Sequence, residues 1–216
     1  MQARSLSDNY FNDLKFQIQP GKAQSVVIDF LKCNLPLYLS QHDKKLTGED
    51  DISQAIVIFL ETQARQNNSD LLFCFQYKYI SSRRSVDIAV VHEGSFKAFF
   101  VIEAKRLPPA NTKDYVQGKT GGIERFKKGH HGQGLFVSAM LGYVQKKGFE
   151  YWHSNVNSWI DNLTPNSNDA ITWCGKDRLR KVESSEDMGL YTSTHSRPEQ
   201  KSISLYHFWL NMVNNE

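Results

Sequence analysis

The segment SVDIAVVHEGSFKAFFVIEAK, residues 85–105, decides the fold class of this chain. Its two apolar runs are rich in β-branched and aromatic residues and fit no helical period, which predicts two strands. The short link HEGSF between them, residues 92–96, predicts an antiparallel hairpin. Three charged residues interrupt these strands, with Asp87 in the first and Glu103 and Lys105 in the second.

Successive side chains on a strand point to opposite faces, so Glu103 and Lys105 share one face and Ala104 points to the other. Unpaired charges are costly inside a sheet. A divalent metal between Asp87 and Glu103 would remove that cost, and so would a tight structural ion cluster. A third interpretation is a misread strand register. The residues alone leave these three interpretations open.

The segments before this hairpin predict helices and one more strand. Residues 47–66 predict a helix, because Thr47 can serve as N-cap, acids fill the first turn and apolar residues recur at helical spacing. An earlier helix is expected to end before Pro36. Residues 71–80, LLFCFQYKYI, predict a strand that pairs with the segment at 85–93.

The segments after the hairpin alternate between helix and strand. A short helix is expected around Ile123 and Phe126, followed by a strand over 134–145 and a helix over 148–163. Two or three strands are predicted in the tail, within residues 170–182, 189–197 and 202–210.

This order predicts a single α/β domain with a mixed sheet flanked by helices. We expect its core at about residues 47–163 and a small strand-rich C-terminal extension at about 168–212.

Composition indicates an ordinary globular protein. The chain has 216 residues, a formal net charge of +3 and three cysteines without metal-ligand or disulfide spacing. Charges near the N-terminus argue against a signal peptide, and no apolar run reaches the length of a membrane span. We therefore expect a cytoplasmic protein that has no membrane partner.

The predicted topology and these charges together resemble the PD-(D/E)xK nuclease superfamily, whose restriction-endonuclease-like fold has an αβββαβ core. The family places an acid on the second core strand and (D/E)-x-K on the third, which correspond here to Asp87 and to Glu103, Ala104 and Lys105. The resemblance covers about residues 47–163. The chain departs from the pattern at Val86, where a proline would precede the acid.

The resemblance implies that Asp87 and Glu103 bind Mg²⁺ or Mn²⁺, since carboxylate oxygens are hard ligands. It further implies that Glu49 on the preceding helix and the backbone carbonyl of Ala104 complete the metal shell. Lys105 would be the catalytic base or would stabilise charge in the transition state. Glu61 is an alternative helix acid, but it falls on the opposite side of the predicted helix.

The implied function is Mg²⁺-dependent hydrolysis of phosphodiester bonds in nucleic acid, most simply DNA, in defence or mobile-element biology by family habit. A homodimer is compatible with that family, although no interface can be recognised in the sequence. The alternative is a non-catalytic module that retains the fold and binds nucleic acid or protein.

Two groups of basic residues are candidate nucleic-acid contacts. Lys119, Arg125, Lys127 and Lys128 lie in a glycine-rich segment that could bind phosphates, or that simply ends a solvated helix. The neighbouring His130 and His131 favour a surface turn. In the tail, His195 and Arg197 alternate on one strand face and could contact a bound backbone, although such charges are usually solvated.

Overall fold

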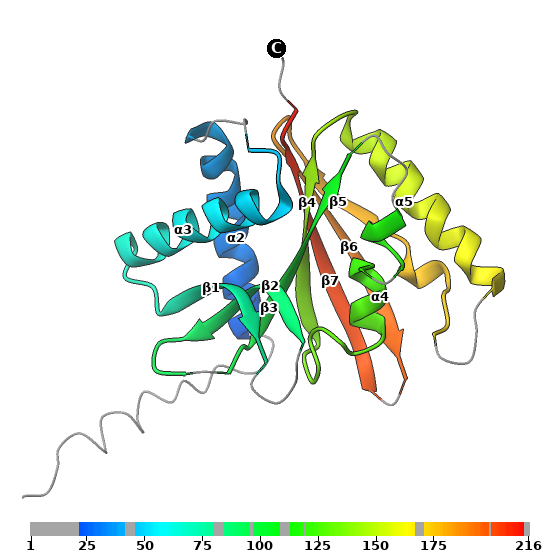
Figure 1. The fold of residues 1–216 in the computed structure, drawn as a ribbon, viewed down its shortest axis with the longest axis horizontal. Coiled ribbons are helices and arrows are strands. Elements are labelled where there is room, and N and C mark those ends of the chain that lie inside the picture. Colours follow the sequence, from blue (N-terminus) through cyan, green and yellow to red (C-terminus); the bar gives the residue numbers. More distant parts are fainter. Residues whose placement is uncertain are drawn as a thin grey trace, which may run out of the picture.

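The computed structural model describes residues 22–41, 46–79, 84–95, 97–108, 113–118, 120–166, 171–198 and 200–213. These residues form a mixed α/β fold in which helices cover both faces of a sheet (Figure 1). None of the helices in these ranges combines the length and the apolar character that crossing a bilayer requires.

The strands of the described residues form one seven-stranded sheet in the order β1-β2-β3-β4-β7-β6-β5. Strands β1 to β3 are antiparallel neighbours, β3, β4 and β7 are parallel, and β7, β6 and β5 are antiparallel. The predicted hairpins and the predicted mixed sheet are therefore confirmed. The strand bounds are β1 Leu71–Lys78, β2 Ser85–His92, β3 Phe100–Leu107, β4 Val137–Val144, β5 Arg180–Ser184, β6 Met188–Arg197 and β7 Gln200–Asn211.

The helices lie in two layers on either side of the sheet (Figure 1). One layer holds α2 (Lys22–Gln41) and α3 (Glu49–Gln66), and the other holds α4 (Gly122–Lys127) and α5 (Phe149–Leu163). Helix α3 begins after Gly48, one residue later than a Thr47 N-cap would place it, and carries three acids in its first turn. The short 3₁₀ helices are η1 (Lys113–Tyr115), η2 (Thr164–Asn166) and η3 (Gly175–Asp177).

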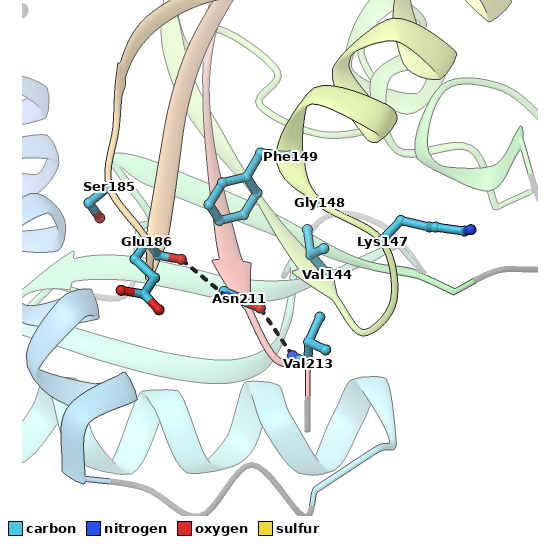
Figure 2. Close-up of a pocket in the computed structure, with 8 residues that line it drawn as sticks. All are labelled: Val144, Lys147, Gly148, Phe149, Ser185, Glu186, Asn211 and Val213. Atoms are coloured by element: carbon cyan, nitrogen blue, oxygen red, sulfur yellow. Dashed lines mark hydrogen bonds between the residues drawn. The ribbon is translucent and has the colours of Figure 1, made fainter. Parts of the chain in front are cut away.

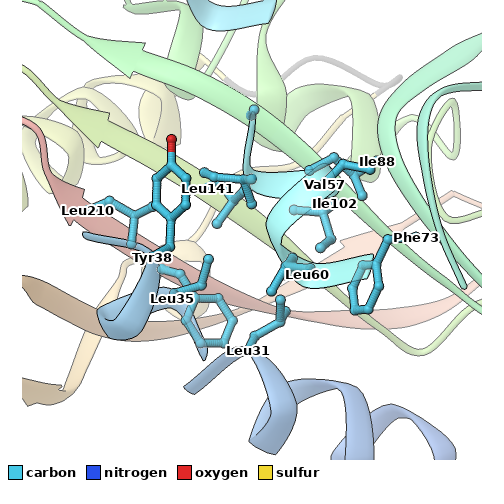
Figure 3. Close-up of a cluster of buried hydrophobic side chains, with 14 of the residues drawn as sticks. Leu31, Leu35, Tyr38, Val57, Leu60, Phe73, Ile88, Ile102, Leu141 and Leu210 are labelled. Carbon is cyan, nitrogen blue, oxygen red and sulfur yellow. The ribbon is translucent and has the colours of Figure 1, made fainter. Parts of the chain in front are cut away.

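The α2–α3 layer contains one apolar core (Figure 3). The predicted helical stripe is buried there, with Ile52, Ile56 and Leu60 all 0% exposed. These side chains pack in the same cluster as Ile88 and Ile102 of the sheet. Burying a side chain of this size contributes about 1.5–3 kcal/mol, so this layer fixes the first residue of α3 relative to β2 and β3.

The opposite layer is built on aromatic side chains. Trp152, Val156 and Ile160 of α5 are buried on one helical face, as the spacing predicts. Ile123 and Phe126 of α4 are both 0% exposed, which confirms that this short helix packs inward.

Helix α2 continues through Pro36 to Gln41, so the expectation that it ends before the proline was wrong. A proline inside a helix removes one backbone hydrogen bond and crowds the preceding turn. Here Leu35, Tyr38 and Leu39 are buried on both sides of the proline. Packing of the last turn against the sheet offsets the local penalty.

The C-terminal strands are not an appended extension. Strand β7 lies beside β4 in parallel, with Leu141 opposite Phe208, and therefore occupies an interior position in the sheet. The strand expected within residues 170–182 is also shorter than predicted. It begins only at Arg180, because residues Gly175–Asp177 form η3 and bury Asp177.

Candidate active site

The candidate site lies where strands β2 and β3 separate. Their ladder ends at the pair Ile88 and Ile102, and Asp87 and Glu103 are the next residues on the two strands. The Asp87 Oδ2 accepts a hydrogen bond of 2.7 Å from the backbone N–H of Ala104. The Asp87 carboxylate thus takes the place of a backbone carbonyl of β2 as hydrogen-bond partner of this N–H. The same hydrogen bond holds the carboxylate between the two strands.

Strand β1 is distorted opposite Asp87. Gln76 has a φ of 49° and falls between the paired residues Phe75 and Tyr77. This left-handed backbone costs roughly 1–2 kcal/mol outside glycine, and such geometry is concentrated at functional sites. The Gln76 Nε2 donates a 3.4 Å hydrogen bond to Oδ2 of Asp50, which ties the distorted strand to the first turn of α3.

The ammonium of Lys105 is the centre of the site. Its Nζ lies 3.0 Å from Glu49 Oε1, 3.1 Å from Glu103 Oε1 and 4.0 Å from Asp87 Oδ2. It also donates a 2.6 Å hydrogen bond to the backbone carbonyl of Ala104. The structure therefore brings together five residues that the sequence analysis singled out, from α3, β2 and β3.

One side of this cluster is open to solvent. The side chains of Glu49 and Asp87 are 30% and 24% exposed, whereas those of Lys105 and Glu103 are 8% and 0% exposed. The Oε2 of Glu49 accepts a 2.9 Å hydrogen bond from the backbone N–H of Arg106, which holds this carboxylate against β3. A ligand would therefore enter past Asp87 and Glu49, with Glu103 as the floor.

Two further side chains contact the Glu103 floor from the α4 layer. Arg125 Nη1 lies 2.9 Å from Glu103 Oε1, and His131 Nε2 lies 3.1 Å from Oε2. The expectation of a surface turn was wrong for His131, which is buried in the loop after α4. The contact of His131 with Glu103 could not be predicted, because the sequence does not indicate which of two adjacent histidines points into the protein.

The pKa values of the two central carboxylates shift in opposite directions. Burial, followed by the charge of Glu103, raises the pKa of Asp87 to about 7, although Lys105 opposes this shift. Burial would raise the pKa of Glu103 too, but His131, Lys105 and Arg125 outweigh it and lower that pKa to about 2. Two like charges in one site often separate in this way.

Lys105 remains an ammonium in this arrangement. Burial alone would lower its pKa, but the carboxylates of Glu103, Asp87 and Glu49 outweigh burial and raise it. A lysine whose pKa is raised is a poor proton acceptor at neutral pH. The position of Lys105 among three carboxylates therefore favours its positively charged form.

The donor atoms at this site fit a hard divalent cation. Asp87, Glu103 and the Ala104 carbonyl offer oxygens, which Mg²⁺ and Mn²⁺ prefer, although His131 already lies 3.1 Å from Oε2 of Glu103. Across the described ranges, no three His, Cys, Asp or Glu side chains are grouped so as to hold a metal ion. The carboxylates converge instead on the ammonium of Lys105.

The basic residues of the glycine-rich segment have different surroundings. Arg125 is 30% exposed beside Glu103 and belongs to the site. Lys128 is exposed at the end of α4 and pairs with Glu124 one turn earlier. Lys119 lies outside the described residues.

Three other basic candidates are buried and are not available to a nucleic-acid backbone. Lys127 and His195 are both 0% exposed, and Arg197 is 6% exposed. The guanidinium of Arg197 donates to the backbone carbonyls of Gly132 and Leu135 and so holds the loop after α4. Alternation on a strand identified a shared face here, but that face is covered by other elements.

Lys127 and His195 belong to a buried polar chain that the sequence analysis missed. Lys127 Nζ and His195 Nδ1 each lie 2.6 Å from Oδ1 of Asp177. The His195 Nε2 lies 2.6 Å from Ser193 Oγ. Because the Asp177 carboxylate can only accept, His195 carries its proton on Nδ1 and accepts at Nε2 from the serine hydroxyl.

The chain continues from β6 to β7 and then to η1, within the α4–α5 layer. His207 Nε2 lies 2.7 Å from Ser193 Oγ, and His207 Nδ1 lies 2.8 Å from the hydroxyl of Tyr115. Trp209 Nε1 donates to that same hydroxyl at 2.8 Å. All hydrogen bonds of this buried polar chain can run in one direction, from Trp209 toward Asp177, with both histidines neutral. The buried polar chain therefore fixes the position of α4, which carries Arg125.

A separate hollow lies at the carboxyl ends of β4 and β7, beside the start of α5 (Figure 2). None of the predicted site residues lines it, and Asn211 within it is already bonded to backbone atoms of Glu186 and Val213. Its lining residues are Val144, Lys147, Gly148, Phe149, Ser185, Glu186, Asn211 and Val213.

A scan against protein-family models found no matching model, and searches of curated proteins and of solved structures found no match to the chain.

Proposed function

We propose that this protein is a Mg²⁺-dependent nuclease that hydrolyses phosphodiester bonds, with DNA as its substrate. The observation that carries the proposal is the convergence of Asp87, Glu103 and Glu49 around Lys105 Nζ, all within 4.0 Å. Three carboxylates and one ammonium at the opened end of a strand pair match the chemistry of metal-assisted phosphoryl transfer.

Asp87, Glu103 and the Ala104 carbonyl are the proposed metal-binding groups, with Glu49 as an additional ligand from α3. The bound ion would lower the pKa of a water molecule and polarise the scissile phosphate. Arg125 and His131 orient the Glu103 carboxylate from beneath. The Ala104 N–H orients the Asp87 carboxylate.

Lys105 is the proposed stabiliser of negative charge on the phosphate. Its ammonium is compact and sits on a flexible stem, so it can follow charge that develops at the reacting phosphorus. The three surrounding acids raise its pKa, which favours this electrostatic role over that of a general base.

Positive charge near the Glu103 side of the site supports a polyanionic substrate. Arg125 is partly exposed at the site, and Lys128 lies at the nearby end of α4. Burial lowers the pKa of His130, and the positive charges of Arg84 and Lys128 lower it further, which indicates that these cations lie close together. A group of cations of this kind would contact phosphates and carry no sequence preference.

The finer assignments belong to this proposal as well. The order α3, β1, β2, β3, α4, β4 corresponds to the αβββαβ core of the restriction-endonuclease-like fold. The three cysteines are free, which suits a cytoplasmic setting. A homodimer would supply the two sites that a double-strand cut requires.

Cleavage of supercoiled plasmid and of labelled DNA and RNA oligonucleotides tests the proposal. We expect nicking with Mg²⁺ or Mn²⁺, none with EDTA, and loss of at least a hundredfold in Asp87→Asn and Lys105→Met. Lys176→Met, at an exposed site, should cleave like the wild type. If the wild type cleaves none of these substrates while folded, a non-catalytic binding module replaces the enzyme.

A further inference from the structure

The position that a metal ion would need is already taken by a cation of the chain. Lys105 Nζ lies between Glu49 and Glu103, 3.0 and 3.1 Å from their nearest oxygens. It also donates to the Ala104 carbonyl, a proposed metal ligand, at 2.6 Å. The ammonium is thus the present counter-ion of the carboxylates.

A divalent ion and this ammonium cannot share the position. Both would be held by the Glu103 carboxylate and the Ala104 carbonyl, and their positive charges would repel at such separations. The Lys105 stem is unbranched and flexible, so the ammonium can leave while the strand stays in place. Metal entry therefore requires Lys105 to move, whereas Glu103 remains held by Arg125 and His131.

A displaced ammonium needs a new partner. Moving Lys105 away from Glu49 and Glu103 removes two ion pairs at close range, and leaving a partly buried charge unpaired is costly. The open side of the cluster, next to Asp87 and Glu49, is where a phosphodiester would arrive. Its anionic oxygens offer the ammonium the partner that the carboxylates no longer provide.

On the basis of the proposed function, we propose that Lys105 acts as a gate: it blocks the divalent metal until a phosphodiester draws the ammonium out of the carboxylate cluster. Metal and substrate then bind cooperatively. Because binding free energies are linked, each ligand raises the affinity of the other by the same factor. A factor of about 5–150 is typical of such coupling.

Mn²⁺ titration of the folded protein, by calorimetry or by electron paramagnetic resonance, tests the gate without any cleavage readout. We expect Lys105→Met and Lys105→Gln to bind Mn²⁺ at least about tenfold more tightly than the wild type. Arg106→Met removes a neighbouring, exposed positive charge without emptying the cluster, so it measures the general electrostatic effect. It should change Mn²⁺ affinity by less than about threefold.

The second arm measures Mn²⁺ binding with and without a phosphodiester analogue, and its main result comes from the wild type. A phosphorothioate oligodeoxynucleotide should raise the Mn²⁺ affinity of the wild type at least about fivefold and leave that of Lys105→Met unchanged. Equal Mn²⁺ affinities in wild type and Lys105→Met, with no oligonucleotide effect, would overturn the gate and leave a metal nuclease standing. If neither protein binds Mn²⁺, the gate and the proposed function both fail.

Discussion

Asp87 closes the gap between β2 and β3 through its side chain, because its Oδ2 accepts the backbone N–H of Ala104 at 2.7 Å just beyond the last paired residues. The same carboxylate faces Lys105 at 4.0 Å. One residue therefore terminates a strand ladder and belongs to the charged cluster, and these two roles can be separated by substitution.

Asp87→Asn and Asp87→Ala should separate these roles. In Asp87→Asn, the asparagine Oδ1 still accepts the hydrogen bond from Ala104 N–H. The substitution also removes a carboxylate whose pKa burial raises to about 7. The stability of this variant at pH 8 should therefore equal or exceed that of the wild type. Alanine leaves that N–H without a partner and should cost about 1–3 kcal/mol. Urea unfolding measures both. Equal losses in the two variants would show that the hydrogen bond is not what Asp87 contributes.

Glu49→Gln should reduce cleavage by about tenfold or more, because Glu49 pairs with Lys105 and is held by Arg106 N–H. Asp51→Asn is the matched control, since it removes another acid from the first turn of α3. Both lose the same favourable interaction with the helix dipole, about 0.3–1 kcal/mol. Initial rates of plasmid nicking compare them, and equal rates in the two variants would exclude Glu49 from the site.

Asp177→Asn should destabilise the protein by about 3–5 kcal/mol, because it leaves the Lys127 ammonium without its buried counter-charge. The double variant Lys127→Met, Asp177→Asn should lose less than the sum of the two single variants. Chemical denaturation of all four proteins in the cycle gives this coupling. A strictly additive result would mean that the buried pair does not hold α4 in place.

The buried histidines predict acid sensitivity. Burial lowers the pKa of His195 and lowers that of His207 much further. Below the unfolded-state pKa of about 6.5, the unfolded chain binds protons that the native chain does not, so stability is complete above that pH and falls as the pH drops. Each histidine adds at most about 1.4 kcal/mol per pH unit.

Between about pH 6.5 and 5, His207→Gln should reduce the slope of the unfolding free energy against pH by up to the equivalent of one proton. Carboxylates titrate in both proteins, so the difference between variant and wild type reports the histidine alone. Unfolding free energies at several pH values supply the measurement. An unchanged slope in the variant would mean that His207 is protonated in the native state.

The sequence was informative where periodicity and burial agree. The β-branched and aromatic runs of 85–105 predicted two adjacent strands, and the stripe of Ile52, Ile56 and Leu60 predicted the helix that carries Glu49. Because a strand has a period of two, the shared face of Glu103 and Lys105 followed directly. The end of the β2–β3 ladder next to Asp87 did not follow, since it depends on the backbone path of both strands.

Contacts between distant segments were out of reach of the sequence. His131 packs under Glu103, and Asp177 joins Lys127 to His195, through pairings that no local pattern encodes. The continuation of α2 past Pro36 also depends on tertiary packing, which overrides a local penalty. Lys127, His195 and Arg197 were predicted to be surface charges. Sequence patterns do not show which elements pack over a given strand or helix face.

Metal binding at the carboxylates and displacement of Lys105 can be observed together in a crystal structure of the wild-type protein soaked with Mn²⁺ and a phosphorothioate oligodeoxynucleotide. The data would be recorded at a wavelength where manganese scatters anomalously. We expect an anomalous peak with oxygens of both Asp87 and Glu103 about 2.0–2.6 Å away, and Lys105 Nζ withdrawn from between Glu49 and Glu103. Unchanged Lys105 contacts and no peak at these carboxylates, in crystals that bind the oligonucleotide, would contradict this expectation.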